Sequence, residues 1–242
     1  MIVAGMMRCK NEARWIKRSI ESIAPLCNAG IVVLDDHSTD GTAEIALGLS
    51  GRVKAAVIPS PFRGLDEVRD KNALLDMALK TKADWVVCID GDEVLMPGHA
   101  DRLKIEMQRI MENGAAIRAL AFSILYLWDR EDQIRVDGVY GSMSRVSAFR
   151  PGKERFEPTG GVNFHCGNCP QAIQGRAHAG VSLLHYGYME RDDRLRKYSW
   201  YNAKDPHNFS ENEYRHIVQG DIVEIPADAV LKHGGPLRLR QL

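Results

Sequence analysis

The chain has 242 residues, of which 45% are hydrophobic and 26% charged, and its 32 basic and 32 acidic residues leave a formal net charge of zero. This composition is typical of a folded globular protein and excludes a disordered one. The balanced charge argues against a broad nucleic-acid-binding or anionic-membrane surface. No apolar run approaches the roughly 18 residues that a membrane span needs, so we expect no transmembrane segment.

The N-terminus shows no secretory signal, because the basic residues follow the short apolar start and no small-residue cleavage site ends it. We therefore expect a cytoplasmic protein whose five cysteines are reduced.

The first hundred residues or so alternate short apolar runs with amphipathic segments, which predicts an α/β fold with a mostly parallel, Rossmann-like sheet flanked by helices. Strands are expected at residues 1–7, 30–34, 53–58 and 84–89, with helices after residue 11, from about residue 42, over residues 66–81 and from residue 97. The turn at residues 37–41 carries hydroxyl and carboxylate groups that suit the cap of the second helix.

From residue 116 the pattern changes. Strands are expected at residues 117–128 and 143–149, with a charged loop at residues 129–141 and no helix between them, so this half is expected to be antiparallel or irregular. A highly charged helix over residues 188–204 predicts a C-terminal helical extension. The expected division is one domain of residues 1–185, made of halves 1–115 and 116–185, with an extension of residues 186–242 packed on it.

Two of the expected parallel strands end in acidic residues, Asp35 and Asp36 after one and Asp90 and Asp92 after another. Ligands of open α/β sheets bind beyond the carboxyl ends of the strands, so both pairs are expected at one edge. Carboxylates there can accept hydrogen bonds from a nucleobase or a ribose, and a pair one residue apart can hold a hard cation against a diphosphate. A plain turn and an acidic helix entry are the alternative interpretations.

Three segments occur together: Lys10-Asn11-Glu12 after the first strand, VLDDHSTDGT at residues 33–42 and WVVCIDGDE at residues 85–93. In order, spacing and strand context they resemble the family 2 glycosyltransferases of the GT-A fold, strongly over residues 1–100 and weakly beyond. The resemblance implies inverting transfer of a sugar from a nucleotide-diphosphate donor, of UDP or GDP type, to a glycan or other hydroxyl acceptor. It also implies a Mn²⁺ or Mg²⁺ ion.

The resemblance implies roles for residues of these segments. Asp36 would contact the base, Asp90 the ribose and Asp92 the metal, while Arg8 and Glu12 would border the nucleotide.

Three further residues have two interpretations each. Lys71 and Asn72 could face the phosphates or lie on a solvated helix face. His185 resembles the late histidine that many GT-A enzymes contribute to the metal or diphosphate, and neutral imidazole suits Mn²⁺. It could equally be a core residue.

An inverting displacement needs a general base to deprotonate the acceptor hydroxyl. In the resembling family a carboxylate in a glycine-containing loop supplies it, and the matching residues 160–166 here contain no acid. We favour His165, whose type has an unperturbed pKa of about 6.5, over Glu157, with Asp129 and Asp137 as further options.

His165, Cys166 and Cys169 are three soft ligands within five residues that could begin a zinc site. Such a site would need His178 or His185 as its fourth ligand, and a turn of small residues near the acceptor is the favoured interpretation.

The charged loop at residues 129–141 or the arginine-rich C-terminal helix could close over the site. The basic residues of that helix alternate with acidic ones, which favours a solvated helix. They are Arg191, Arg194, Arg196 and Lys197.

Two other functions remain open from the sequence. A nucleotidyltransferase would normally show a glycine-rich basic loop after the first strand, where this chain has residues 8–12. A non-catalytic nucleotide-binding or zinc-binding module would explain the missing acid near residue 161.

Overall fold

The structure, a computed structural model, describes residues 1–50, 54–61, 64, 66–114, 116–159, 166–205, 209–229, 231 and 236–242, with the backbone alone for residues 209–213. These residues form two compact units, the first made of residues 1–122 and 144–182 and the second of residues 123–143 and 183–242. The domain boundaries expected from the sequence stay a prediction. In the described part of the chain, no helix is long and apolar enough to cross a membrane.

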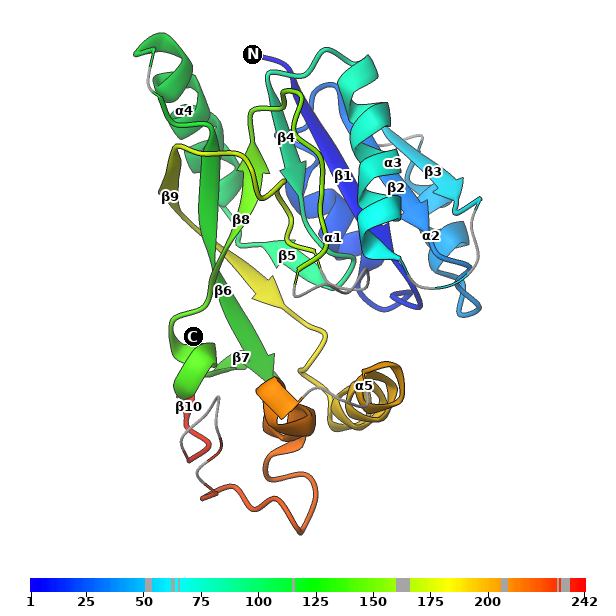
Figure 1. Cartoon of the computed structure of the whole chain (residues 1–242), viewed down its shortest axis with the longest axis vertical. Helices are drawn as coiled ribbons and strands as arrows, with labels where there is room; N and C mark the ends of the chain where they lie inside the picture. Colours follow the sequence, from blue (N-terminus) through cyan, green and yellow to red (C-terminus); the bar gives the residue numbers. More distant parts are fainter. Residues whose placement is uncertain are drawn as a thin grey trace. The chain divides into compact units, whose positions relative to one another are not determined.

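The first unit contains a parallel sheet, as predicted (Figure 1). Strand β1 (Val3–Cys9) lies between β2 (Gly30–Asp35) and β4 (Trp85–Cys88) and is parallel to both, and β3 (Ala55–Pro59) continues the sheet beyond β2. The runs that form β1, β2 and β4 are apolar because both faces of the sheet are covered. Because the three strands are parallel, the carboxyl ends of β2 and β4 lie at the same edge, beside the end of β1.

The pairing changes to antiparallel after β4. Strand β8 (Ser144–Phe149) runs antiparallel to β4, and β6 (Ala119–Trp128) follows β8 in the sheet order. A short strand, β5 (Glu93–Leu95), pairs with β9 (Arg176–His185). The predicted parallel half followed by an antiparallel half is confirmed.

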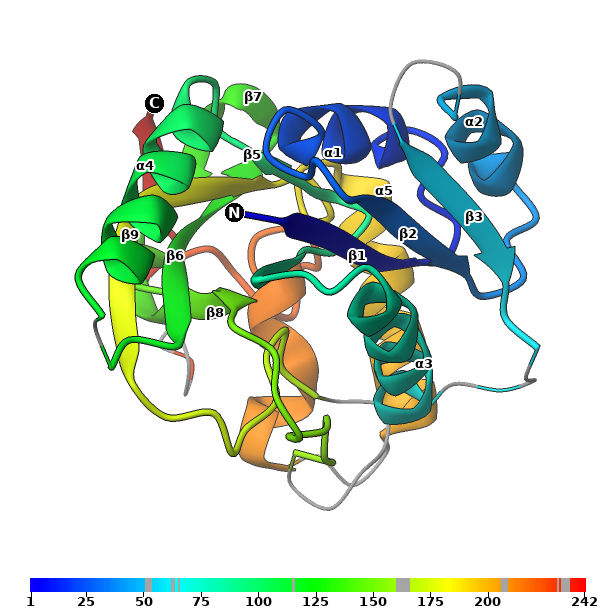
Figure 2. The same ribbon diagram turned by 90° about the horizontal axis from the view of Figure 1, so that it is seen from above.

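Helices cover both faces of the parallel strands (Figure 2). On one face lie α1 (Ile16–Ile23) and α2 (Thr42–Gly48), and on the other lies α3 (Glu67–Lys80), which packs against β1 and β2. Helix α4 (His99–Glu112) follows β5. The predicted α/β fold, with a mostly parallel sheet flanked by helices, is confirmed for this unit.

The second unit corrects one prediction. Residues 129–141, expected to be a loop, form strand β7 (Arg130–Arg135) and the 3₁₀ turn η1 (Gly138–Gly141). Strand β7 pairs antiparallel with the end of β6 and with β10 (Leu239–Gln241). The strand was not predicted because its residues are almost all charged or polar, and its buried members include the arginine Arg135.

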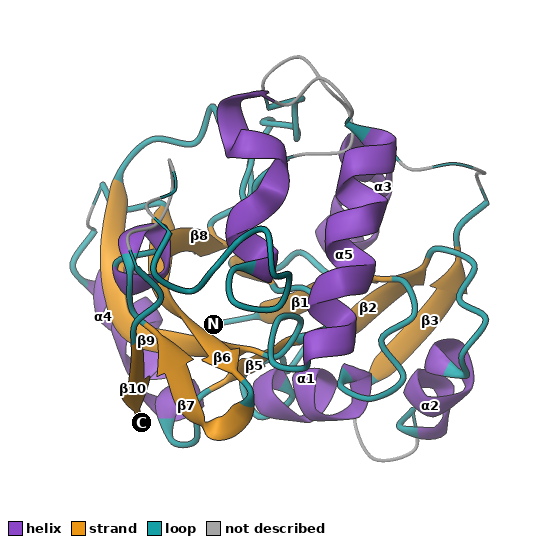
Figure 3. Cartoon of the chain, turned by 90° about the horizontal axis from the view of Figure 1, so that it is seen from below, coloured by secondary structure: helices purple, strands orange, loops and turns teal. Residues whose placement is uncertain are grey.

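The charged helix expected over residues 188–204 is confirmed as α5 (Arg191–Lys204). Figure 3 shows it beside the 3₁₀ segment η2 (Phe209–Val218). The expectation that its basic residues face solvent is wrong for Arg194, which is 1% exposed. The Arg194 guanidinium binds Asp129 at 2.7 Å and Asp221 at 2.5 Å.

Candidate functional site

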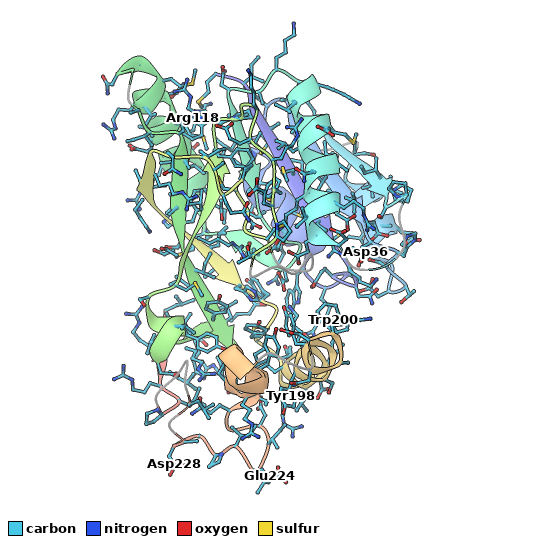
Figure 4. The ribbon with its side chains drawn as sticks, in the orientation of Figure 1. Asp36, Arg118, Tyr198, Trp200, Glu224 and Asp228 are labelled. Carbon is cyan, nitrogen blue, oxygen red and sulfur yellow. The ribbon has the colours of Figure 1, made fainter. Side chains whose placement is uncertain are left out.

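The carboxyl edge of the parallel sheet brings the predicted acidic residues together. Asp36 directly follows β2, whose Asp35 pairs with Cys9 at the end of β1. Asp90 and Asp92 follow β4 on the other side of β1. Figure 4 labels Asp36 at this edge. The expectation that both acidic pairs share one edge is therefore confirmed.

Side-chain hydrogen bonds tie the loop after β1 to the loop after β2. The Asn11 N–H donates to Ser38 Oγ at 2.9 Å, and Asn11 Oδ1 accepts from the Thr39 N–H at 2.9 Å. The Glu12 N–H donates to Thr42 Oγ1 at 2.8 Å. Asn11 has a φ of 55°, a left-handed conformation that asparagine adopts more readily than most residues. The first two sequence motifs thus form one interlocked structure.

Asp40 completes this structure. Its carboxylate accepts hydrogen bonds from the N–H groups of Ala13 at 3.0 Å and Thr42 at 3.1 Å, and from the Thr42 hydroxyl. Asp40 thus binds the first N–H of helix α2, as expected of this turn, although the N-cap residue is Gly41 and makes no side-chain cap hydrogen bond. Although burial acts in the opposite sense, the hydrogen bonds from Thr42 and Ala13 lower the pKa of Asp40 below its usual value.

Asp36 is held by two cations. Arg8 donates to its Oδ2 atom at 2.7 Å and Lys10 does so at 3.2 Å, and Asp36 is 2% exposed. Arg8 also donates through Nε to Asp70 of α3 at 3.0 Å. Arg8 and Asp36, both expected beside a nucleotide, are therefore in direct contact. Asp70, which was not predicted, holds Arg8 in place from 62 residues away in the chain.

Gly91 lets the acidic motif pack against the end of β1. A Cβ atom at this position would lie 2.9 Å from Cys9 Cβ, closer than such atoms approach, and a tight 3.3 Å from Glu12 Cγ. The Gly91 carbonyl accepts a hydrogen bond from Ser19 Oγ of α1 at 2.7 Å. The glycine between Asp90 and Asp92 is thus required by this close approach, which places the predicted Glu12 beside the motif.

Arg145 of β8 is a site residue that the sequence did not indicate. Its NH1 atom lies 3.1 Å from Asp90 Oδ2, and its NH2 atom binds the Glu93 carboxylate. The antiparallel register pairs Val87 with Ala148, and continued along both strands it places Arg145 opposite Asp90. Finding this contact requires knowledge of which strand neighbours β4.

Glu93 is fully buried behind the acidic motif and orients it. Its Oε2 atom accepts from the Asp90 N–H at 3.1 Å. Burial raises the pKa of Glu93 to about 7. The charges of Asp90 and Asp92 also raise this pKa, whereas the Arg145 guanidinium lowers it. Glu93 therefore supports the loop, whereas Asp90, with 33% of its side chain exposed, can reach a ligand.

The acidic motif suits a hard divalent cation that is shared with a ligand. Among the described residues, no group of three or more histidine, cysteine or acidic side chains could hold a metal ion. Mg²⁺, however, is usually bound by one or two carboxylates together with substrate phosphates, not by a complete protein cage. Asp90 and Asp92 fit that donor set, and Asp92 is 5% exposed.

His185 belongs to the second unit. Its Nδ1 atom accepts from the Gly187 N–H at 3.1 Å, and its ring centroid lies 4.9 Å from those of both Tyr126 and Tyr188. This aromatic packing agrees with the core interpretation, and the metal-binding role of His185 stays a prediction.

The candidate bases differ in their surroundings. His165 lies outside the described residues. Glu157 is exposed, and its N–H donates to Gln171 Oε1 at 3.1 Å. Asp129 and Asp137 are both bound by arginines, as the salt bridges of Arg194 and Arg135 show.

Lys71 and Asn72 do not lie on a solvated helix face, so that interpretation is wrong. Lys71 is 3% exposed and donates to Asn168 Oδ1 at 2.8 Å and the Cys166 carbonyl at 3.1 Å. The Asn72 amide donates to the Phe156 carbonyl and accepts from the Phe156 N–H, each at 3.0 Å. Both residues tie α3 to the segments on either side of residues 160–165.

Cys166 and Cys169 are buried free thiols. Burial raises the pKa of Cys166 to about 11 and that of Cys169 to about 12, which favours the thiol over the metal-binding thiolate. His178, a suggested fourth zinc ligand, accepts from the Gly180 N–H at 3.0 Å through Nδ1. These observations give the zinc interpretation no support.

Comparison with known proteins identifies relatives along most of the chain. The chain is 26% identical over 219 residues to an uncharacterised protein of Mycobacterium tuberculosis, covering 85% of this chain and 51% of the relative. It is 32% identical over 132 residues to an uncharacterised glycosyltransferase of Rickettsia felis, covering 54% of this chain and 42% of the relative. The chain thus spans about half the length of these curated relatives or less.

A solved structure was also found. It is glucosyl-3-phosphoglycerate synthase from Mycobacterium tuberculosis in complex with Mn²⁺ and UDP-glucose, 27% identical, with 52% of this chain and 43% of the other covered and a TM-score of 0.36.

The model of the glycosyl transferase family 2 matches residues 6–167. This range covers more than half of the chain and contains the three motifs at the carboxyl edge of the sheet. The chain therefore belongs to glycosyl transferase family 2.

Proposed function

We propose that this chain transfers a sugar, with inversion, from a nucleoside-diphosphate sugar of UDP or GDP type to a hydroxyl-bearing acceptor such as a glycan. The observation that carries the proposal is the meeting of Asp36 with Asp90 and Asp92 at one sheet edge. Membership of the glycosyltransferase family supports the reaction type.

The nucleoside is proposed to lie across the end of β1. Arg8 and Lys10 both bind Oδ2 of Asp36, so Oδ1 is the atom proposed to accept from an N–H of the base. Asp90 is proposed to bind the ribose hydroxyls through its exposed carboxylate, with Glu12 and Arg8 at the border of the nucleotide. Because Arg8 is also tied to the buried Asp70, this arrangement is preorganised and needs little reordering on binding.

Asp92 is proposed to hold Mn²⁺ or Mg²⁺. A bound divalent cation stabilises the negative charge that develops on a leaving diphosphate. Two observations support this proposal: Gly91 packs closely on Cys9 beside Asp92, and Glu93 binds the same loop from behind.

A base must accept the proton of the acceptor hydroxyl as it attacks the anomeric carbon. We propose His165 for this role, with Glu157 as the second candidate. Replacing His165 by alanine and Glu157 by glutamine, separately, should decide between them when consumption of the donor is followed. If both variants keep wild-type rates, both assignments are wrong.

A thermal-shift titration tests the proposed donor class. UDP, GDP, CMP and dTDP are each added to the protein with and without Mn²⁺. One diphosphate should raise the stability in a metal-dependent manner, by about 2.7 kcal/mol at a hundred times its dissociation constant. Equal shifts with all four nucleotides, or shifts that do not depend on the metal, would contradict the proposal.

Replacement of Asp36 by asparagine should weaken this binding, because the proposed acceptor for the base N–H loses its charge. Asp76→Asn is the matched control, because Asp76 lies on the solvent side of α3 with 58% of its side chain exposed. Its nucleotide shift should equal that of the wild type.

A further inference from the structure

The first unit contains a pocket of about 520 Å³ next to the acidic motif. This volume is within the roughly 300–1,000 Å³ of small-molecule sites. Residues of β6, β8 and β9 and of the segment after Cys166 line it. The polar side chains that matter here are those of Ser144, Arg145, Asn168, Gln171, Arg176 and His178. Of the described residues at its wall, none is acidic.

Asn168 presents a buried donor at this pocket. The residue is 1% exposed, and its Oδ1 atom accepts from Lys71 Nζ at 2.8 Å. A lysine ammonium only donates, so this bond fixes which end of the amide faces Lys71. The Asn168 Nδ2 atom therefore lies at the end of the amide away from Lys71. It is buried without a hydrogen-bond partner among the described residues. Buried donors rarely stay without a partner, so the Nδ2 atom indicates that a ligand with a hydrogen-bond acceptor binds here.

Two basic residues accompany this donor: Arg176 lines the same pocket, and Lys71 binds the other end of the Asn168 amide. Arg176 is exposed, and its guanidinium is held by the carbonyls of Ile173 at 3.1 Å and Gln171 at 2.8 Å. Burial acts to lower the pKa of Lys71, which binds Asn168, but the charges of Glu67 and Asp90 raise this pKa above its usual value. The Lys71 ammonium therefore stays charged. A pocket with this charge and this buried N–H favours a ligand with negatively charged oxygens.

The pocket is directly connected to the proposed donor site. Arg145 lines the pocket and also binds Asp90, the residue proposed to hold the ribose. A group bound in the pocket is thus separated from the acidic motif by one side chain. The pocket therefore borders the proposed donor site.

We infer that this pocket binds the acceptor through a carboxylate or phosphate group, held by Asn168 Nδ2 and the guanidinium groups of Arg145 and Arg176. The acceptor would then be an anionic hydroxyl compound, not a neutral glycan. The inference rests on the proposed function, because it assigns the acceptor class of that site.

Asn168→Asp is the sharpest variant. An aspartate still accepts from Lys71, but it replaces the Nδ2 donor by a charged oxygen that repels an anion. Arg176→Gln removes a positive charge from an exposed residue. It is the second test of the pocket if the Asn168→Asp protein does not fold. Arg109→Gln is the matched control, because Arg109 has 58% of its side chain exposed and lies on α4 outside the pocket wall.

The probes are inorganic phosphate and acetate, titrated at constant ionic strength with saturating nucleotide and Mn²⁺ present. The wild type and Arg109→Gln should bind one of the probes equally well. Asn168→Asp should bind it about ten-fold more weakly or worse, equivalent to about 1.4 kcal/mol, and Arg176→Gln should also be weakened. A preference for phosphate or for acetate distinguishes the two acceptor groups.

Equal anion binding by the wild type, Asn168→Asp and Arg176→Gln, or no anion binding by the wild type, would overturn the inference. The nucleotide titration is a separate readout. If the protein binds a nucleotide but no anion, only the assignment of the pocket is wrong. If it binds an anion at the pocket but shows no thermal shift with any nucleotide, the proposed donor is wrong and the anion pocket stands.

Discussion

The carboxyl edge of the first unit and the core of the second unit are stabilised in different ways. At the carboxyl edge, short polar side chains bind the backbone of neighbouring loops, as Asn11 and Asp40 do. In the second unit, two buried arginines bind carboxylates and lie over one indole ring. The guanidinium carbons of Arg135 and Arg194 are 4.7 Å and 4.4 Å from the centre of the Trp128 ring.

This difference has a consequence for both stability and prediction. The hydrogen bonds at the carboxyl edge join solvent-exposed groups, so the loss of one has a limited cost. A buried arginine neutralises a buried carboxylate, and removing the arginine leaves that charge buried and unpaired. The Arg194 partners Asp129 and Asp221 lie 65 and 27 residues away.

The largest effect on stability should come from Arg194→Met. It keeps much of the side-chain volume but leaves the carboxylate of Asp221, 10% exposed, without its guanidinium. We expect a loss of about 3–5 kcal/mol in the free energy of unfolding, measured by urea unfolding followed through tryptophan fluorescence. Arg196→Met is the control on the same helix, with 52% of the side chain exposed, and should cost less than about 1 kcal/mol. Similar losses in the two variants would mean that the buried cluster does not dominate.

Gly91→Ala should have an intermediate effect. The added Cβ would lie 2.9 Å from Cys9 Cβ, so β1 and the acidic motif must move apart. Such overpacking costs about 1–3 kcal/mol, and nucleotide binding should weaken as well. Gly48→Ala is the matched control, because a Cβ there meets nothing within 4 Å. A fully stable and active Gly91→Ala protein would disprove the close-packing account of this motif.

Asp40→Asn should have the smallest effect and should depend on pH. The folded-state pKa of Asp40 is lowered, so its contribution to stability is present above the unfolded pKa of about 3.9 and is lost as the pH falls through the folded value. Because the group is exposed, we expect a cost of about 0.5–1 kcal/mol near pH 7. The urea midpoints of wild type and variant should converge as the pH falls below the unfolded pKa of about 3.9. A difference that stays constant with pH would show that the charge of Asp40 does not stabilise the turn.

The same contrast explains what the sequence could predict of the fold. The parallel strands were recognisable because burial on both faces demands apolar runs such as that of β2. Strand β7 was missed because its sequence, REDQIR, has no such run. Its buried arginine, Arg135, binds the nearby Asp137 and also Gln219, which lies 84 residues further along the chain.

For the site, the sequence indicated the residues that belong to local motifs. Asp36, Asp90 and Asp92 follow strands and could be placed at one edge from the strand order. Arg145 and Asn168 could not, because their contacts depend on the pairing of β8 with β4 and on the burial of Lys71.

The most direct test of the account is the metal dependence of nucleotide binding and sugar transfer in Asp92→Asn. The substitution keeps the shape of the side chain and removes the charge proposed to hold the cation. We predict that the variant loses the Mn²⁺-dependent nucleotide shift and at least about 100-fold in turnover. The control Asp101→Asn, on the exposed start of α4, should match the wild type in both. An Asp92→Asn protein with the wild-type metal-dependent shift and turnover would contradict the assignment of the carboxyl edge as the donor site.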